Sequence, residues 1–186
     1  MKFINAYAGS ALCTPSRTSF MTGRYPARTS VGLIEPLTLS KHDSTIGLTP
    51  DYTSLPALLK KGGYETYLAG KWHLGFMPAF NPMNNGYDEF FGLHSGAVDY
   101  ISHTSSDGNN DLYENDKPVT KAGYMTDLIL EKNIAGNQES TCKTIFSECH
   151  VHRTSLSFAE TRRHNISTRP FELDKGRFAG NIRCHG

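Results

Sequence analysis

The sequence has no long apolar run, no internal repeat and almost no net charge. Because it lacks about 20 consecutive apolar residues, it predicts no membrane-spanning helix. A formal net charge of +1 at pH 7 gives no bulk electrostatic attraction to nucleic acid or to a membrane surface. The opening residues also lack the pattern of a secretory signal peptide. With 186 residues, of which 38% are hydrophobic, the chain is long enough for one domain.

Cysteine is scarce before residue 140, and the single one there opens the pattern C-T-P-S-R at Cys13. Pro15 fits the first turn of a helix, where a missing N–H group costs nothing, and Gly23 suits its C-terminal cap. Cys13 then lies at a helix N-terminus, which favours an anion. Arg17 follows about one turn later with a permanently charged guanidinium. The alternative without a function is that the pattern only marks the capped start of a helix that carries a buried thiol.

A second pattern, G-K-W-H-L-G, contains Lys71 and His73. It follows a strand-like run at 64–69, which itself follows a helix-like run at 55–61 with glycines as a stop signal. A charged loop at the carboxyl end of a strand is where open α/β sheets place ligands. Lys71 and His73 are two residues apart, so both can point the same way in an extended segment. Without the first pattern, both would be read as surface residues.

Together, the two patterns resemble the signature of type I, formylglycine-dependent sulfatases. A third block, at 86–92 and 99–103, is similar to arylsulfatase B-like enzymes, and the resemblance covers about residues 2–132. It implies an α/β, alkaline-phosphatase-like sulfatase domain that hydrolyses sulfate esters of sugars or phenols. The following residues predict a hairpin at 112–119 and an amphipathic helix over 123–132.

The resemblance also implies the roles of the site residues. Cys13 is converted to formylglycine by a formylglycine-generating enzyme, and the hydrated aldehyde is the nucleophile. Arg17 and Lys71 hold the formylglycine and the sulfate oxygens, and His73 orients or deprotonates the diol. A calcium ion bridges the diol at position 13 and a sulfate oxygen. His103 is a candidate for the substrate pocket, although an ordinary loop histidine fits its position equally well.

The chain departs from the family pattern in its metal ligands. The acidic pair upstream of the cysteine motif and the later Asp-Asn pair are not visible, and Asp88, Asp99 and Asp107 lie in the wrong context to replace them. We therefore expect an N-terminally truncated fragment that binds calcium poorly and is inactive alone. The parent is expected to be exported, in the periplasm, outside the cell or in a lysosome, while the location of this chain stays open.

Residues 134–186 differ in character from the rest of the chain. They hold three of the four cysteines and show no helical or strand period. We predict a partial catalytic domain over 1–133 and a disordered, unpatterned tail over 134–186. Codons allowed for residues 146–156 spell sulfatase-like text when read one base later, so a shifted reading frame is the preferred interpretation. The alternative is a metal site without standard zinc spacing, formed by Cys142, Cys149, His150, His152, Cys184 and His185.

Two other functions remain open. The chain can be a non-catalytic fragment or a small binding module, because its catalytic set is incomplete. It can also belong to relatives with the same cysteine signature that hydrolyse phosphonate or phosphate monoesters. The partners expected under the sulfatase interpretation are a sulfate-ester substrate, in particular a sulfated glycan, and the formylglycine-generating enzyme, without nucleic acid or membrane.

Overall fold

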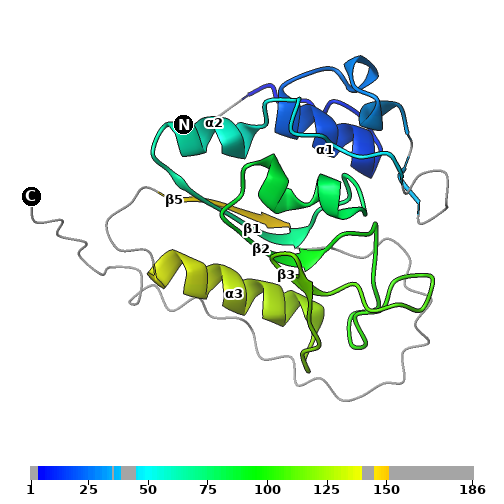
Figure 1. The fold of residues 1–186 in the computed structure, drawn as a ribbon, viewed down its shortest axis with the longest axis vertical. Coiled ribbons are helices and arrows are strands. Elements are labelled where there is room, and N and C mark those ends of the chain that lie inside the picture. Colours follow the sequence, from blue (N-terminus) through cyan, green and yellow to red (C-terminus); the bar gives the residue numbers. More distant parts are fainter. Residues whose placement is uncertain (1–3, 35, 39–44, 140–144, 151–186) are drawn as a thin grey trace, which may run out of the picture. The chain divides into compact units, whose positions relative to one another are not determined.

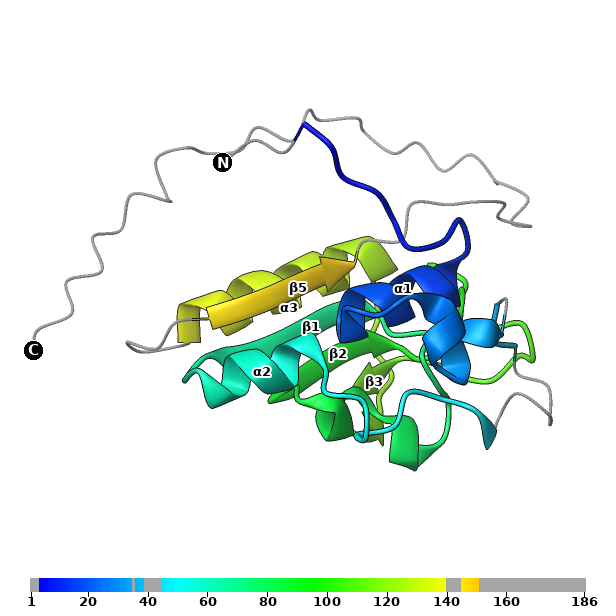
Figure 2. The same ribbon diagram turned by 90° about the horizontal axis from the view of Figure 1, so that it is seen from above.

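The computed structural model describes residues 4–34, 36–38, 45–139 and 145–150. These residues form a mixed sheet of five strands with helices on both faces. Helices α1 (Cys13–Thr22) and α2 (Leu55–Lys61) lie on one face, and α3 (Met125–Glu139) lies on the other (Figures 1 and 2). The predicted α/β class is therefore confirmed at the level of architecture.

The sheet has the strand order β4-β3-β2-β1-β5. The three longer strands are parallel, with Gly70 opposite Gly92 where β1 and β2 pair. The two short strands are antiparallel and form the predicted hairpin, which turns at Asn115 with a positive φ of 59°. The strands are β1 (Glu65–Lys71), β2 (Glu89–Leu93), β3 (Tyr113–Glu114), β4 (Lys117–Pro118) and β5 (Ile145–His150).

Local signals set the ends of the first two α-helices. In α1, Gly23 adopts the left-handed conformation and its N–H group donates to the carbonyl of Ser19. In α2, the Ser54 side chain accepts a hydrogen bond from Ala57 N, and the helix stops at Gly62. Short 3-10 helices fill the connections: η1 (Pro26–Arg28), η2 (Val31–Leu33), η4 (Pro78–Phe80) and η5 (Pro82–Asn85).

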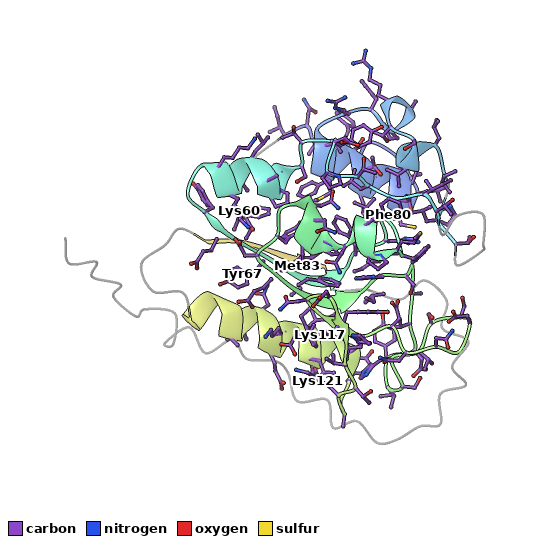
Figure 3. All side chains as sticks on the ribbon, viewed as in Figure 1. Lys60, Tyr67, Phe80, Met83, Lys117 and Lys121 are labelled. Carbon is purple, nitrogen blue, oxygen red and sulfur yellow. The ribbon has the colours of Figure 1, made fainter. Side chains whose placement is uncertain are left out.

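The core has two parts, one on each face of the sheet. Side chains alternate along the strands, so Leu68 and Phe90 pack toward α1 while Ala69 and Phe91 pack toward α3. On the α1 side, the buried Trp72 donates its Nε1–H to the carbonyl of Phe80 at 2.8 Å. Figure 3 shows Phe80 in the layer between the sheet and α1. Both faces are covered, as parallel strands require.

Two elements extend past residue 133, where the sequence predicted an unpatterned tail. Helix α3 ends at Glu139, and β5 pairs in parallel with β1. Strand pairing is made by backbone groups, so β5 needs no alternating side-chain pattern to form. Phe146 packs against the core cluster on the α1 side. Residues 140–144 and 151–186 lie outside the described residues, and with them Cys142, His152, Cys184 and His185 of the alternative metal site. The shifted reading frame, the disordered tail and the domain boundary between 133 and 134 stay predictions.

No helix within the described ranges is both long and apolar enough to cross a membrane.

Candidate active site

The two sequence motifs meet where α1 begins and β1 ends. Cys13 is the first residue of α1, and the preceding Leu12 has extended backbone angles and offers no side-chain cap. The first N–H groups of the helix are therefore not capped by a side chain at Leu12. Lys71 is the last residue of β1, and the structure brings its side chain close enough to Cys13 for the two groups to interact. This contact joins residues that lie far apart in the sequence.

Lys71 is a buried cation, with only 7% of its surface exposed. The pKa of Lys71 is lowered from 10.5 to about 8. Burial lowers it most, the interaction with Cys13 raises it, and the nearby charge of Arg17 lowers it. At pH 7 the ammonium is still mostly protonated, but it is close to releasing its proton. The group can therefore stabilise negative charge at the position of the Cys13 side chain.

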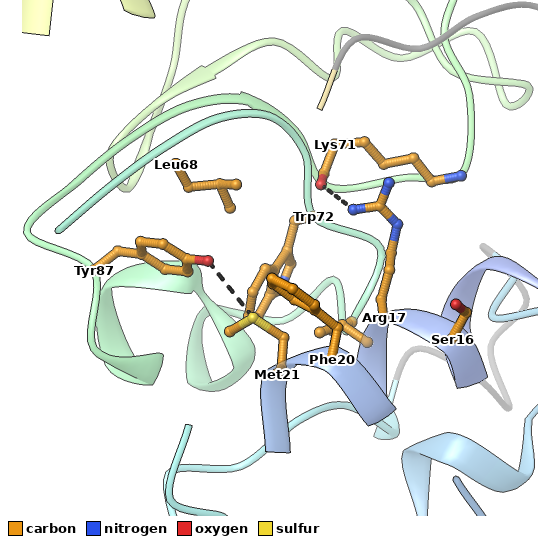
Figure 4. A pocket seen from close by; sticks show the side chains of 9 residues that line it. Ser16, Arg17, Phe20, Met21, Leu68, Lys71, Trp72 and Tyr87 are labelled. Carbon is orange, nitrogen blue, oxygen red and sulfur yellow. Dashed lines mark hydrogen bonds between the residues drawn. The ribbon is translucent and has the colours of Figure 1, made fainter. Parts of the chain in front are cut away.

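Arg17 is fixed beside Lys71 by a hydrogen bond to the main chain. Its Nη1 donates to the carbonyl oxygen of Lys71 at 2.8 Å (Figure 4). The guanidinium and the ammonium thus lie in the same small region, although like charges repel. An anion bound there would relieve that repulsion, which is the physical case for an anion site.

His73 lies just beyond the end of β1, with a positive φ of 56° and only 2% of its surface exposed. Its backbone N–H donates to the carbonyl of His94 at 3.1 Å. Its Nε2 lies 2.8 Å from the carbonyl oxygen of Leu37. A carbonyl oxygen only accepts, so Nε2 carries the proton and the neutral ring has its lone pair on Nδ1.

His103 is not part of this cluster. It is 1% exposed, has a positive φ of 58°, and its Nε2 donates to the carbonyl of Gly123 at 3.1 Å. Its backbone N–H donates to the carbonyl of Asp99, and this bond closes the turn at 99–103. The structure therefore gives His103 a structural contact, and its role in binding substrate stays a prediction.

A cavity of about 190 Å³ lies beside the cluster, between α1 and the sheet (Figure 4). Its polar wall comes from Ser16, Arg17 and Lys71. The rest is apolar, and there Tyr87 donates its hydroxyl to the sulfur of Met21 at 3.5 Å. The remaining lining residues are Phe20, Leu68, Trp72 and Leu74.

Sequence reasoning did not identify the residues that surround His73, namely Thr14, Leu37 and Gly96. Thr14 lies inside the first motif, next to Cys13. Its hydroxyl is neither charged nor a typical catalytic group, so the sequence gives no reason to single it out. Leu37 lies in a segment without a helical or strand period. No local signal predicts that a leucine carbonyl will bind an imidazole.

Among the residues that the structure describes, no group of three or more His, Cys, Asp or Glu side chains could hold a metal ion. The set around Cys13 is cationic, with Arg17 and Lys71 as its charged members. Calcium prefers several oxygen ligands with negative charge. The described residues therefore do not fit a calcium ion.

Comparison with known proteins identifies the family. A model of the sulfatase family matches residues 1–155. The chain is 40% identical over 103 residues to human N-acetylgalactosamine-6-sulfatase, covering 52% of this chain and 20% of that one. It is 40% identical over 121 residues to mouse arylsulfatase J, covering 62% of this chain and 19% of that one. It thus spans about a fifth of the length of these curated relatives.

A solved structure supports the same assignment. BT4656, in complex with its substrate D-glucosamine-2-N,6-O-disulfate, shares 28% identity with a TM-score of 0.58. The match covers 77% of this chain and 25% of that protein. The sequence match and the fold agree with the prediction made from the two motifs. The chain therefore belongs to the sulfatase family.

Proposed function

We propose that this chain carries part of the active site of a sulfuric ester hydrolase in which Cys13 becomes formylglycine. The observation that supports the proposal most directly is the meeting of Cys13 with Lys71 and Arg17. A nucleophile position at a helix N-terminus, flanked by two cations, suits the binding and cleavage of an anionic ester.

The proposed chemistry uses both hydroxyl groups of the hydrated aldehyde. One hydroxyl oxygen attacks sulfur, the ester S–O bond breaks, and the alcohol leaves with a proton. The second hydroxyl then loses its proton and reforms the carbonyl group, and the carbon–oxygen bond to sulfate breaks. Water rehydrates the aldehyde for the next cycle. The sequence of steps is covalent catalysis by an activated nucleophile.

The side chains around position 13 have distinct parts in this proposal. Lys71 and Arg17 stabilise the negative charge that grows on the sulfate oxygens as the ester bond breaks. The lowered pKa of Lys71, caused mainly by burial, also suits it to give or take a proton near neutral pH. His73 orients or deprotonates the diol, and its Nε2–H bond to Leu37 leaves Nδ1 as the basic atom.

The proposed substrate is a sulfated sugar. The human relative is named for the 6-sulfate of N-acetylgalactosamine, and BT4656 was solved with a glucosamine disulfate. The proposed partner is a formylglycine-generating enzyme that oxidises Cys13 before catalysis. An exported parent protein is proposed from the family alone.

The test is co-production of the chain with a formylglycine-generating enzyme, followed by two measurements. Mass spectrometry of the peptide that holds Cys13 should show the mass loss of a thiol-to-aldehyde conversion. Any sulfate release from a 6-sulfated glucosamine should be lost in Cys13→Ala and retained in Cys142→Ala, which removes a thiol outside both motifs.

The outcomes separate the candidate functions. Measurable sulfate release that is equal in the unchanged chain and in Cys13→Ala would contradict the proposed nucleophile. A converted Cys13 with no sulfate release would indicate a non-catalytic fragment or a binding module. Faster release of phosphate than of sulfate from matched esters would favour the phosphate or phosphonate monoester alternative.

A further inference from the structure

The first residue after the nucleophile position, Thr14, is joined to His73 by a closed set of hydrogen bonds. The Thr14 hydroxyl donates to the carbonyl of His73 at 3.3 Å and accepts from the backbone N–H of Leu37 at 3.1 Å. The carbonyl of Leu37 accepts from Nε2 of His73 at 2.8 Å. Each of the three residues therefore contacts the other two.

This set is shielded from water. Thr14 is 0% exposed, His73 2% and Leu37 3%. Hydrogen bonds between buried groups are costly to break, because the groups left behind find no water. The one hydroxyl of Thr14 is used both as donor and as acceptor, so no other side chain of similar size supplies both bonds except serine.

Two of these hydrogen bonds hold the backbone of Leu37, one at its N–H group and one at its carbonyl group. Its N–H is held by Thr14, and its carbonyl, on the other side of the same Cα atom, accepts from the imidazole of His73. Because the carbonyl can only accept, it selects the ring form with the proton on Nε2. Thr14 thus influences the proton position on His73 without contacting the ring.

Gly96 also lies against the imidazole of His73. A Cβ atom at this position would lie 2.9 Å from Cε1 and 3.0 Å from Nε2 of His73. Both distances are shorter than van der Waals contact, so any side chain would force the ring out of its present position. The absence of a side chain at Gly96 leaves the space that the ring occupies.

We propose that Thr14 and Gly96 are positioning residues for His73. Thr14 fixes the tautomer and direction of the imidazole through Leu37, and Gly96 provides the room for that orientation. The inference rests on the proposed function, in which His73 acts on the diol at position 13. It adds a direct physical link between the helix that carries the nucleophile and the histidine that serves it.

The test uses nitrogen NMR of the His73 ring in the full chain, at a pH where the ring is neutral. In the parent and in Thr14→Ser, we expect the Nε2–H form. In Thr14→Val, the Nε2–H share should fall, and exchange of the Leu37 amide hydrogen should accelerate about tenfold, as for one lost hydrogen bond.

Thr18→Val is the matched control. Thr18 lies on the same helix, is also 0% exposed, and donates to the carbonyl of Thr14 at 2.8 Å. This variant loses one equally buried hydrogen bond, so a general loosening of α1 would alter the His73 signals in it as well. We expect parent-like His73 signals and Leu37 exchange in Thr18→Val.

The proposal fails if folded Thr14→Val keeps both the parental tautomer and the parental Leu37 exchange. If Thr14→Val does not fold, Gly96→Ala decides, since unchanged ring signals in that variant also contradict the proposal. If neither folds, an Nδ1–H form of His73 in the parent overturns it. None of these measurements depends on sulfate release, so a failure of the proposed function would be seen separately.

Discussion

The guanidinium of Arg17 donates a hydrogen bond of 2.8 Å to the backbone carbonyl of Lys71, 54 residues further along the chain. The bond attaches the second turn of α1 to the end of β1. It also places a permanent positive charge beside an ammonium group whose pKa is lowered to about 8, mainly by burial. The two cations are therefore coupled, and changing one should alter the other.

Removing the charge of Arg17 should raise the pKa of Lys71. In Arg17→Gln the like charge is lost, so protonated Lys71 is repelled less and its pKa should lie above the parental value of about 8. Arg17→Lys is the control, because it keeps the charge but loses the planar guanidinium. NMR titration of the Lys71 side chain measures the shift. An unchanged pKa in Arg17→Gln would contradict the coupling.

Burial of Lys71 should make the protein more stable at alkaline pH. Because the folded-state pKa of about 8 lies below the ordinary value of 10.5, the unfolded chain binds an extra proton between these two pH values. The free energy of unfolding should therefore rise through that window, by up to about 3 kcal/mol. In Lys71→Met this rise should disappear. Urea unfolding across the window measures it, and parallel curves for the two proteins would refute the prediction.

His94 should make the protein sensitive to acid. Its ring is stacked on Tyr113 with centroids 4.4 Å apart, and its Nε2 has no hydrogen-bond partner among the described residues. Burial lowers the pKa of His94 from 6.5 to about 4. The unfolded chain thus binds the extra proton between these values, and stability should fall by up to about 3 kcal/mol as the pH falls through them.

The variant His94→Phe keeps a ring between Phe90 and Tyr113 but has no group to protonate. Its free energy of unfolding should not fall between pH 6.5 and 4 by the amount seen in the parent. The difference between the two proteins isolates His94 from the carboxyl groups that titrate in the same range. An equal loss of stability in both would show that His94 is not the acid-sensitive group.

A side chain at Gly92 should disrupt the sheet next to the site. A Cβ atom there would lie 1.9 Å from the carbonyl oxygen of Gly70, the residue before Lys71. The strands β1 and β2 would have to separate, so Gly92→Ala should destabilise the fold by about 3 kcal/mol or more. Gly63→Ala is the control, since its Cβ meets nothing within 4 Å and only the positive φ of 86° opposes it. That control should cost about 1–2 kcal/mol.

Chemical denaturation measures both glycine variants. Equal stability losses would show that the close approach of the strands at Gly92 is not limiting. A larger loss in Gly92→Ala, accompanied by a changed environment of Lys71, would show that the strand pairing positions the ammonium group.

Much of the fold near the motifs could be predicted because its signals are local. A proline in the first turn and Gly23 at the end predicted α1, and the helix-like run at 55–61 with its glycine stop signal predicted α2. The two helices depend on residues close together in the sequence. The meeting of Cys13 and Lys71 was implied by the resemblance to sulfatases, in which both residues act at one site.

The parts that escaped prediction depend on long-range contacts. Strand β5 has no alternating pattern, and it is defined by backbone pairing with β1. Leu37 reaches Thr14 and His73 by main-chain atoms, so its side-chain type carries no information about the contact. Likewise, the bond of His103 to Gly123 depends on how two loops meet.

The positive φ of His73 has a consequence for how this segment evolved. A residue with a Cβ atom in the left-handed region costs about 1–2 kcal/mol relative to the ordinary conformation, and glycine avoids that cost. Selection for folding alone would therefore favour glycine at the turn. Under the role proposed for His73, an imidazole at this turn costs thermodynamic stability and supplies the chemistry, so natural variation there should be narrow and stabilising substitutions should be inactivating.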